Sequence, residues 1–232
     1  MTRRGAALLG WIAAGGCAAA PVTPATRSDP GLNAWVLEVV RGYPTDGSHG
    51  YHWPNAAESD WEGTTRPVEY GGRALTQGDP ERRSYCCGLT FEVYVRALVL
   101  AGGGPAPGVT ADALHELRLR FFGDSDAGER RRLVQFGLTS LGLGVAVERL
   151  EDARAGDFVQ FWRHSGSGHQ AVFVNWVWDG EQIVGLTYWS SQPSTRGIGY
   201  RTEWIGPAGV DPAAIHLARA DWPLRDRAGT ER

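Results

Sequence analysis

The chain has few cysteines, no lysine and almost no net charge. The few cysteines and the low net charge each exclude a class of protein. Only three cysteines occur in 232 residues, whereas a disulfide framework in an exported domain needs an even set of well-spaced cysteines. The formal net charge is −3, every basic residue is arginine, and the arginines are scattered along the chain. The sequence therefore shows no basic stripe, and we expect no nucleic-acid partner.

Long hydrophobic runs are also missing, but the N-terminus has the layout of an export signal. Arg3 and Arg4 precede an apolar stretch over residues 5–14 that is too short to span a bilayer. Small residues then lead to Cys17, and this order resembles the cleavage box of a bacterial lipoprotein, in which the cysteine is lipidated. We expect a signal peptide of this type at 1–17. Ordinary secretion, with Cys17 in the discarded peptide, is the alternative.

The rest of the sequence suggests a tether followed by one domain. Residues 18–30 are rich in Ala, Pro, Thr and Ser and lack apolar periodicity, as a flexible linker does. About 200 residues remain, which is enough for one domain with a sizeable core, and we assign it to 31–225. With a lipid on Cys17 and Ala18 after it, the expected location is the outer membrane, where the domain would face the periplasm.

Hydrophobic periodicity predicts helices in the first half of this domain. Apolar residues recur at helical spacing in four segments: from Pro30 to Gly42, over 86–101, over 110–122, and after Asp124-Ser125. Between the first two helices lies a long loop at 43–84 that is rich in Gly, Pro, Trp and Tyr. A short hairpin is expected within it at Gly71-Gly72. Loops of this length are usually functional or disordered, and the aromatic content argues against disorder.

Beyond residue 143 the pattern changes to short β-rich runs separated by turn residues. These runs cover 144–150, 157–162, 169–178, 181–189 and 197–205. Helices followed by a meandering antiparallel sheet make an α+β fold.

Cys86 and Cys87 are adjacent, which excludes an ordinary disulfide between them. Neighbouring cysteines can close only a strained ring. Their place at the start of an expected helix indicates a reactive thiol instead, because a helix N-terminus and a nearby imidazole both lower the pKa of a thiol. His169, at the start of an expected strand, could supply that imidazole. The alternatives are small buried cysteines and a structural histidine.

Three motifs in this order resemble those of the NlpC-type cell-wall cysteine peptidases and their CHAP relatives. Cys86-Cys87-Gly88-Leu89 corresponds to their Cys-Ser-Gly-Leu motif, and Gly156-Asp157-Phe158-Val159 corresponds to their Gly-Asp-Leu/Phe-Val strand. Gly168-His169 and the apolar residues after it correspond to their Gly-His strand. The resemblance covers roughly 86–192, and residues 31–85 match nothing in these families. It implies a papain-like NlpC-type core with N-terminal helices packed on an antiparallel sheet.

The resemblance also implies a thiol hydrolase with a Cys-His-polar triad. Cys86 would attack a carbonyl carbon and His169 would carry the proton. The third residue has no clean match in the sequence. Gln192 is the first candidate, because its amide oxygen can accept from the imidazole N–H. The other candidates are Ser191, Ser190 and, more weakly, Asn175.

Backbone N–H groups at the helix start would stabilise the oxyanion, with Tyr85 and Cys87 beside it. Tyr85 stands where Asp or Asn is common in these families, and Cys87 stands where Ser is common.

An amide in peptidoglycan or in a wall peptide is the substrate that the resemblance implies, with the 43–84 loop shaping the groove. No cofactor is expected. No metal is expected either, because His49 and His52 have metal-like spacing without a second cluster of ligands. The rival hypothesis is a non-catalytic lipoprotein that binds a wall polymer or a protein partner through the same cleft.

Overall fold

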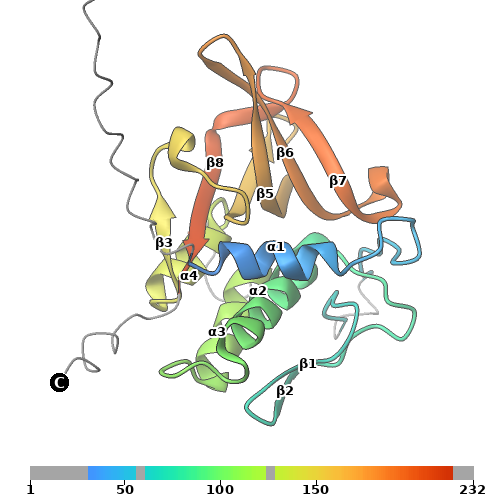
Figure 1. Cartoon of the computed structure of the whole chain (residues 1–232). Helices are drawn as coiled ribbons and strands as arrows, with labels where there is room; N and C mark the ends of the chain where they lie inside the picture. The colour runs from blue at the N-terminus through green and yellow to red at the C-terminus, as the bar shows by residue number, and fades with distance from the viewer. Residues whose placement is uncertain (1–30, 56–60, 124–128, 222–232) are drawn as a thin grey trace, which may run out of the picture.

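A six-stranded antiparallel sheet and a layer of helices build the domain (Figure 1). The computed structural model describes residues 31–55, 61–123 and 129–221. The expected signal peptide, Cys17 and the tether lie outside these residues. Among the residues described, no helix is long and apolar enough to cross a bilayer.

The expected helices are present in the first half of the domain. They are α1 (Asn33–Arg41), α2 (Cys86–Gly102), α3 (Ala111–Phe122) and α4 (Leu133–Ser140). α3 begins as predicted, because the side chain of Thr110 caps it by accepting from the Ala113 N–H at 3.1 Å. The predicted start of the fourth helix, after Asp124-Ser125, lies outside the described residues, and α4 itself begins at Leu133, since Arg132 before it has non-helical backbone angles.

The sheet contains the expected meander and one strand that the sequence analysis missed. Its strands are β3 (Gly144–Val147), β4 (Phe158–Arg163), β5 (Gly168–Asp179), β6 (Gln182–Gln192), β7 (Gly197–Trp204) and β8 (Val210–Ala220). Their order is β3-β8-β4-β5-β6-β7. β8 was missed because Pro212 interrupts its pattern. The structure accommodates this proline near the start of β8, where the register with β4 shifts between Phe161 and Arg163.

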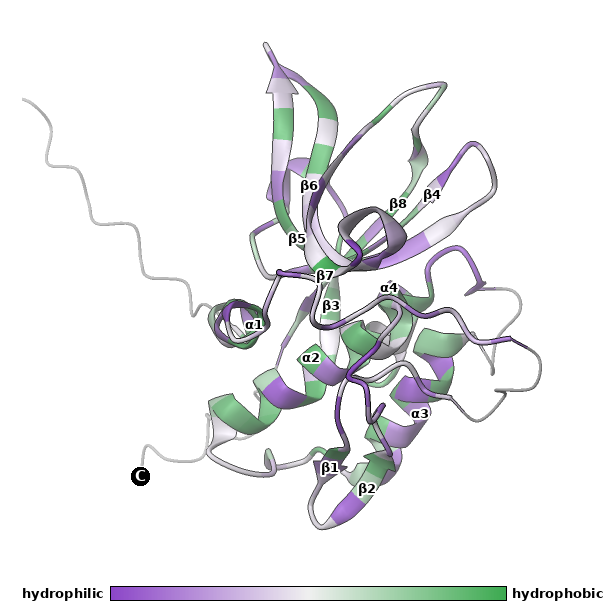
Figure 2. Cartoon of the chain, turned by 90° about the vertical axis from the view of Figure 1, so that its right-hand side faces the viewer, coloured by the Kyte–Doolittle hydropathy of each residue, from purple (hydrophilic) through white to green (hydrophobic). Residues whose placement is uncertain are grey.

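The helices pack against the sheet at one end of its strands (Figure 2), and the helices and the sheet bury a shared apolar core. α2 is apolar on almost every side, as expected of a helix enclosed by other elements. It packs against α1, α3, β5 and β6, and Figure 2 shows the helices gathered at one end of the strands. A second apolar cluster, which includes Phe161, Phe173 and Tyr188, lies within the sheet layer. The start of α2 lies beside the end of β6, where Ser191 is hydrogen-bonded to Ser84.

The 43–84 segment is held against α2 by one buried carboxylate. Glu92 has no exposed surface. Its Oε1 accepts from the Tyr43 hydroxyl at 2.6 Å and from the Thr65 hydroxyl at 2.8 Å, and its Oε2 accepts from the Thr65 N–H at 2.7 Å. Arg66 lies 3.5 Å from the same carboxylate. This contact orders a segment that the sequence identified only as an aromatic loop.

The same segment contains the expected hairpin. β1 (Val68–Tyr70) pairs with β2 (Arg73–Thr76) around a turn at Gly71 and Gly72. Two-residue turns of this kind match the twist of the flanking strands.

We predict that Glu92→Ala lowers the free energy of unfolding by about 3–5 kcal/mol, because it leaves buried donors without an acceptor. Urea denaturation measures this loss, and limited proteolysis should show faster cleavage within 43–84. Glu69→Ala removes an exposed carboxylate from β1 and is the matched control, with an expected change of less than about 0.5 kcal/mol. Similar losses in both variants would contradict the anchoring role of Glu92.

Candidate active site

The start of α2 is fixed against the ends of β5 and β6. The Ser191 hydroxyl donates to the Ser84 carbonyl at 3.0 Å, which ties the end of β6 to the residues before the helix. On the other side the backbone of residues 62–63 crosses the first turn. A Cβ on Gly88 would lie 2.3 Å from the carbonyl oxygens of Glu62 and Gly63, so a side chain has no room there. The glycine of the Cys-Cys-Gly-Leu motif is therefore required by packing.

Cys86 occupies the first position of α2, and the structure places it beside His169. Tyr85 is the N-cap residue and has extended backbone angles, so Cys86 begins the helix as the sequence predicts. The cysteine is buried, with 7% of its surface exposed. The unsatisfied N–H groups and the dipole of the helix favour a negative charge at this position.

The pKa of the Cys86 thiol lies well below its ordinary value. The largest cause is a hydrogen bond from the Cys87 thiol, and the two Sγ atoms are 3.8 Å apart. Burial opposes this shift by disfavouring the thiolate. A hydrogen bond from His169, its charge and the Gln170 N–H then lower the pKa of Cys86 further. The two residues that the sequence nominated as nucleophile and base are thus in direct interaction.

The His169 ring packs against two aromatic rings, one on β4 and one on β6. Its ring centroid lies 5.6 Å from that of Phe161 and 5.3 Å from that of Tyr188. His169 is 8% exposed, and its Nε2 atom has no hydrogen-bond partner among the residues described. The Phe161 and Tyr188 centroids are themselves 5.2 Å apart, so the two rings pack together against the imidazole and restrict its orientation, which a general base requires.

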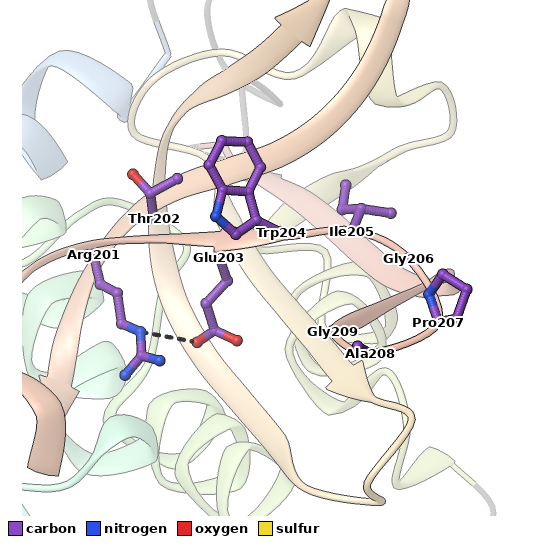
Figure 3. Close-up of a pocket in the computed structure, with 9 residues that line it drawn as sticks. All are labelled: Arg201, Thr202, Glu203, Trp204, Ile205, Gly206, Pro207, Ala208 and Gly209. Carbon is purple, nitrogen blue, oxygen red and sulfur yellow. Dashed lines mark ion pairs between the residues drawn. The ribbon is translucent and has the colours of Figure 1, made fainter.

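The Tyr188 side chain is held in turn by the ion pair between Glu203 and Arg163. The Tyr188 hydroxyl donates to Glu203 at 2.5 Å, and Arg163 Nε donates to the other carboxylate oxygen at 2.6 Å. Arg201 lies 3.5 Å away and projects from the same side of β7 as Glu203 (Figure 3). Burial acts to raise the pKa of Glu203, but hydrogen bonds from Arg163 and Tyr188 lower it below its ordinary value. Glu203 therefore stays ionised and holds Tyr188 in place.

The three candidates for the third residue differ in what their side chains bind. The Ser190 hydroxyl donates to the Gln170 carbonyl at 2.7 Å, and the Ser191 hydroxyl donates to the Ser84 carbonyl. Both hydroxyls therefore fix the backbone around the site. Gln192 is buried, and neither of its amide atoms has a hydrogen-bond partner within the described ranges. The weaker candidate Asn175 is exposed and donates to the Trp176 carbonyl.

Strand register favours Gln192 as the partner of His169. β5 pairs with β6 through Val172 and Trp189, and continuing this register by three residues brings Gln192 opposite His169. Because side chains alternate across a strand, directly opposed residues project from the same face. Buried polar atoms rarely lack partners. The His169 Nε2 and the Gln192 amide both lack one among the residues described, and this makes Gln192 the candidate that could accept a hydrogen bond from the imidazole.

Tyr51 is a site residue that the sequence analysis missed. A parallel bridge to Ser84 brings it to the start of α2. The pKa of its hydroxyl rises to about 12, first through burial and then through the charges of Cys86 and Cys87. The hydroxyl is therefore protonated at neutral pH and lies near both thiols. Its only sequence signal was its place in the aromatic 43–84 segment.

Tyr85 and neighbouring aromatic residues form a wall at the start of α2. The Tyr85 ring lies 5.3 Å from Trp53, 5.3 Å from Trp61 and 5.6 Å from Phe122, measured between centroids. Trp53 is 60% exposed, so the wall presents an indole to solvent. Tyr85 was expected near the oxyanion. The structure shows its backbone capping the helix and its ring within this wall.

No metal-binding group of three or more His, Cys, Asp or Glu side chains occurs in the described part of the chain. Of the two loop histidines with metal-like spacing, His49 is buried and its ring contacts Tyr43, while the His52 ring contacts Trp61. Comparison with known proteins found no matching family model, curated protein or solved structure.

We predict that Cys87→Ala raises the pKa of Cys86, because it removes the largest contribution to thiolate stabilisation. The rate of Cys86 alkylation by iodoacetamide should then increase at higher pH than in the wild type, as followed by mass spectrometry from about pH 4 to pH 9. Cys87→Ser keeps a donor and should stay close to the wild-type profile. An unchanged midpoint in Cys87→Ala would show that Cys87 does not set the pKa.

Proposed function

We propose that this protein is an exported thiol hydrolase that cleaves an amide bond in peptidoglycan or in a wall peptide. The observation that carries the proposal is a thiol of lowered pKa at a helix N-terminus, in direct interaction with a histidine on a neighbouring strand. The α+β arrangement is compatible with the papain-like core that the motifs imply. The substrate and the export to the outer membrane rest on the sequence motifs.

In this mechanism the Cys86 thiolate attacks the carbonyl carbon, and a C–S bond forms while the carbonyl oxygen becomes an oxyanion. His169 donates a proton to the leaving amine, and the C–N bond breaks to give a thioester. A water molecule then attacks this thioester. His169 accepts the proton of that water, and Cys86 leaves as thiolate with release of the carboxylic acid.

Three further groups complete the proposed machinery. Backbone N–H groups in the first turn of α2 stabilise the oxyanion, and the protonated Tyr51 hydroxyl is a second donor near the same atoms. Gln192 orients the imidazole by accepting from Nε2–H, which leaves the other ring nitrogen for Cys86.

The aromatic wall supplies a binding surface for the substrate. Trp53 and Trp61 lie on the 43–84 segment and Tyr85 is the N-cap residue of α2, and their rings can pack against peptide or sugar.

One observation favours the rival function, a lipoprotein that binds a wall polymer or a partner without cleaving it. Cys86 is only 7% exposed, so a substrate must approach closely past Cys87 and Tyr51 to reach the sulfur.

Digestion of purified sacculi tests the proposal. Wild-type protein should release fragments that mass spectrometry identifies, whereas Cys86→Ala and His169→Ala should lower turnover at least about a thousandfold. Cys87→Ser, which keeps a donor, and His115→Ala, which replaces a histidine on α3, are the matched controls and should keep most of the activity. Thermal unfolding should be similar for all variants. Identical fragments from wild type and Cys86→Ala would exclude the thiol mechanism, and no fragments from any form would favour the binding protein.

A separate prediction concerns the third residue. Gln192→Ala should lower kcat about a hundredfold with little change in KM, because a misoriented imidazole slows proton transfer more than binding. Gln192→Glu retains an acceptor and should recover part of the loss. Asn175→Ala is the control for an exposed amide on the neighbouring strand and should have little effect. Equal kcat values for wild type and Gln192→Ala would remove Gln192 from the triad.

A further inference from the structure

The side chains of Cys86 and Cys87 are both thiols, and their sulfur atoms already lie close together. The two Sγ atoms are 3.8 Å apart. A disulfide bond is about 2.05 Å long, so the sulfurs must approach by less than about 2 Å to form one. Rotation about a Cα–Cβ bond moves a sulfur atom by a comparable distance. The pair can therefore form a bond without a movement of the helix.

The two thiols differ in how readily they react with an oxidant. The pKa of Cys86 is lowered, so Cys86 supplies the thiolate, which is the form that peroxides oxidise. Cys86 keeps 7% of its surface exposed and Cys87 is half-buried, which leaves the pair open to a molecule as small as hydrogen peroxide. Oxidation is therefore expected to begin at Cys86.

Cys87 offers a reaction that a hydroxyl in its place would not. Donation of a hydrogen bond to the Cys86 thiolate does not require sulfur, because a serine hydroxyl donates as well. A thiol can in addition attack a neighbouring oxidised sulfur and form a disulfide. With its sulfur in contact with that of Cys86, Cys87 is in position for this second reaction.

The surrounding backbone would keep the resulting ring strained. Adjacent Cα atoms are about 3.8 Å apart across a trans peptide, which is shorter than the usual span of a disulfide. The Cys86 carbonyl accepts from the Thr90 hydroxyl at 2.7 Å, and Gly88 lies against the carbonyl groups of Glu62 and Gly63. The peptide between the cysteines is thus held in the helix and resists relaxing around the ring. Strained disulfides are the more easily reduced ones, so the oxidation would be reversible.

We propose that Cys86 and Cys87 form a site of reversible oxidation by a peroxide, in which a disulfide between the adjacent residues switches the reactive thiol off. This inference rests on the proposed function, since it names the regulation of that same site. The ring also keeps Cys86 from the sulfinic and sulfonic acids, which thiol reductants do not reverse.

The oxidation takes two steps. The Cys86 thiolate attacks one oxygen of the peroxide, an S–O bond forms, the O–O bond breaks, and the leaving hydroxide takes a proton from His169. The Cys87 thiol then attacks the sulfur of this sulfenic acid. The S–S bond forms, the S–O bond breaks, and hydroxide leaves with the thiol proton as water. The two sulfurs together lose two electrons, which the peroxide gains, and a dithiol reductant reverses the change by thiol–disulfide exchange.

Peptide mapping of the full chain tests this site. Trypsin cleaves after Arg83 and Arg96, so one peptide contains both adjacent cysteines and excludes Cys17. After treatment with hydrogen peroxide at neutral pH, this peptide should be two hydrogen atoms lighter and should regain them in dithiothreitol. Labelling of Cys86 by iodoacetamide should fall at least about tenfold on oxidation and should recover on reduction.

Cys87→Ser is the matched variant, because it keeps a donor to Cys86 and removes only the second sulfur. Its peptide should gain one oxygen atom, trapped by dimedone, and then further oxygens that dithiothreitol does not remove. Recovery of Cys86 labelling should therefore be at least about tenfold lower than in the wild type. Cys86→Ala lacks the initiating thiolate and should remain largely unoxidised at the same dose. Thermal unfolding should be similar for all forms before oxidation.

Three outcomes would overturn the oxidation site: equal dimedone adducts in wild type and Cys87→Ser, a disulfide between two protein molecules, or a wild-type peptide that peroxide leaves unchanged. The result is separable from that of the sacculus digestion, because it is read from the mass of the peptide. A reversible loss of two hydrogens without sacculus cleavage would uphold the site and remove the hydrolase. Cleavage by a wild type whose peptide keeps both thiols in peroxide would do the reverse.

Discussion

The close approach between the start of α2 and the strand ends is the constraint on which the rest of the structure depends. It needs a glycine at position 88, because the backbone at Glu62 and Gly63 crosses the first helical turn at a distance that excludes a Cβ. It also needs the Ser191 hydroxyl on the Ser84 carbonyl, which fixes the end of β6 against the helix entry. These contacts set the position of Cys86 relative to β5, and the thiol–imidazole interaction follows from that position.

The buried carboxylate of Glu92 extends this constraint to the 43–84 segment. This carboxylate on α2 accepts hydrogen bonds from the Tyr43 hydroxyl and from both the hydroxyl and the N–H of Thr65. The helix that begins at Cys86 thereby also holds the segment that brings Tyr51 and the aromatic wall to its N-terminus. In the proposed hydrolase this preorganisation would matter, because catalytic groups must keep their geometry before substrate arrives.

The sequence predicted well those features that local periodicity determines. The four helices, the Gly71-Gly72 hairpin and the β4–β7 meander were expected from apolar spacing and turn residues. β8 was missed because Pro212 and scattered polar residues hide a strand that tertiary pairing stabilises. At the candidate site, motif order predicted Cys86 and His169, and the structure brings these two residues into interaction. Tyr51 was missed because its position depends on a bridge to Ser84 across a long loop, which no local pattern encodes.

The adjacent cysteines have a physical explanation in this geometry. A thiol enclosed by protein resists ionisation, because burial disfavours the thiolate. The helix terminus and His169 act against that penalty, yet the largest single contribution comes from the neighbouring Cys87 thiol, 3.8 Å away. Adjacent residues project in different directions around a helix. At the start of α2 the Cys87 side chain nevertheless brings its sulfur to 3.8 Å from that of Cys86. Cys87 therefore serves as a donor to the Cys86 thiolate, a role that a serine hydroxyl could also fill. This explains why a second cysteine is compatible with the position and why a disulfide is not needed to account for the pair.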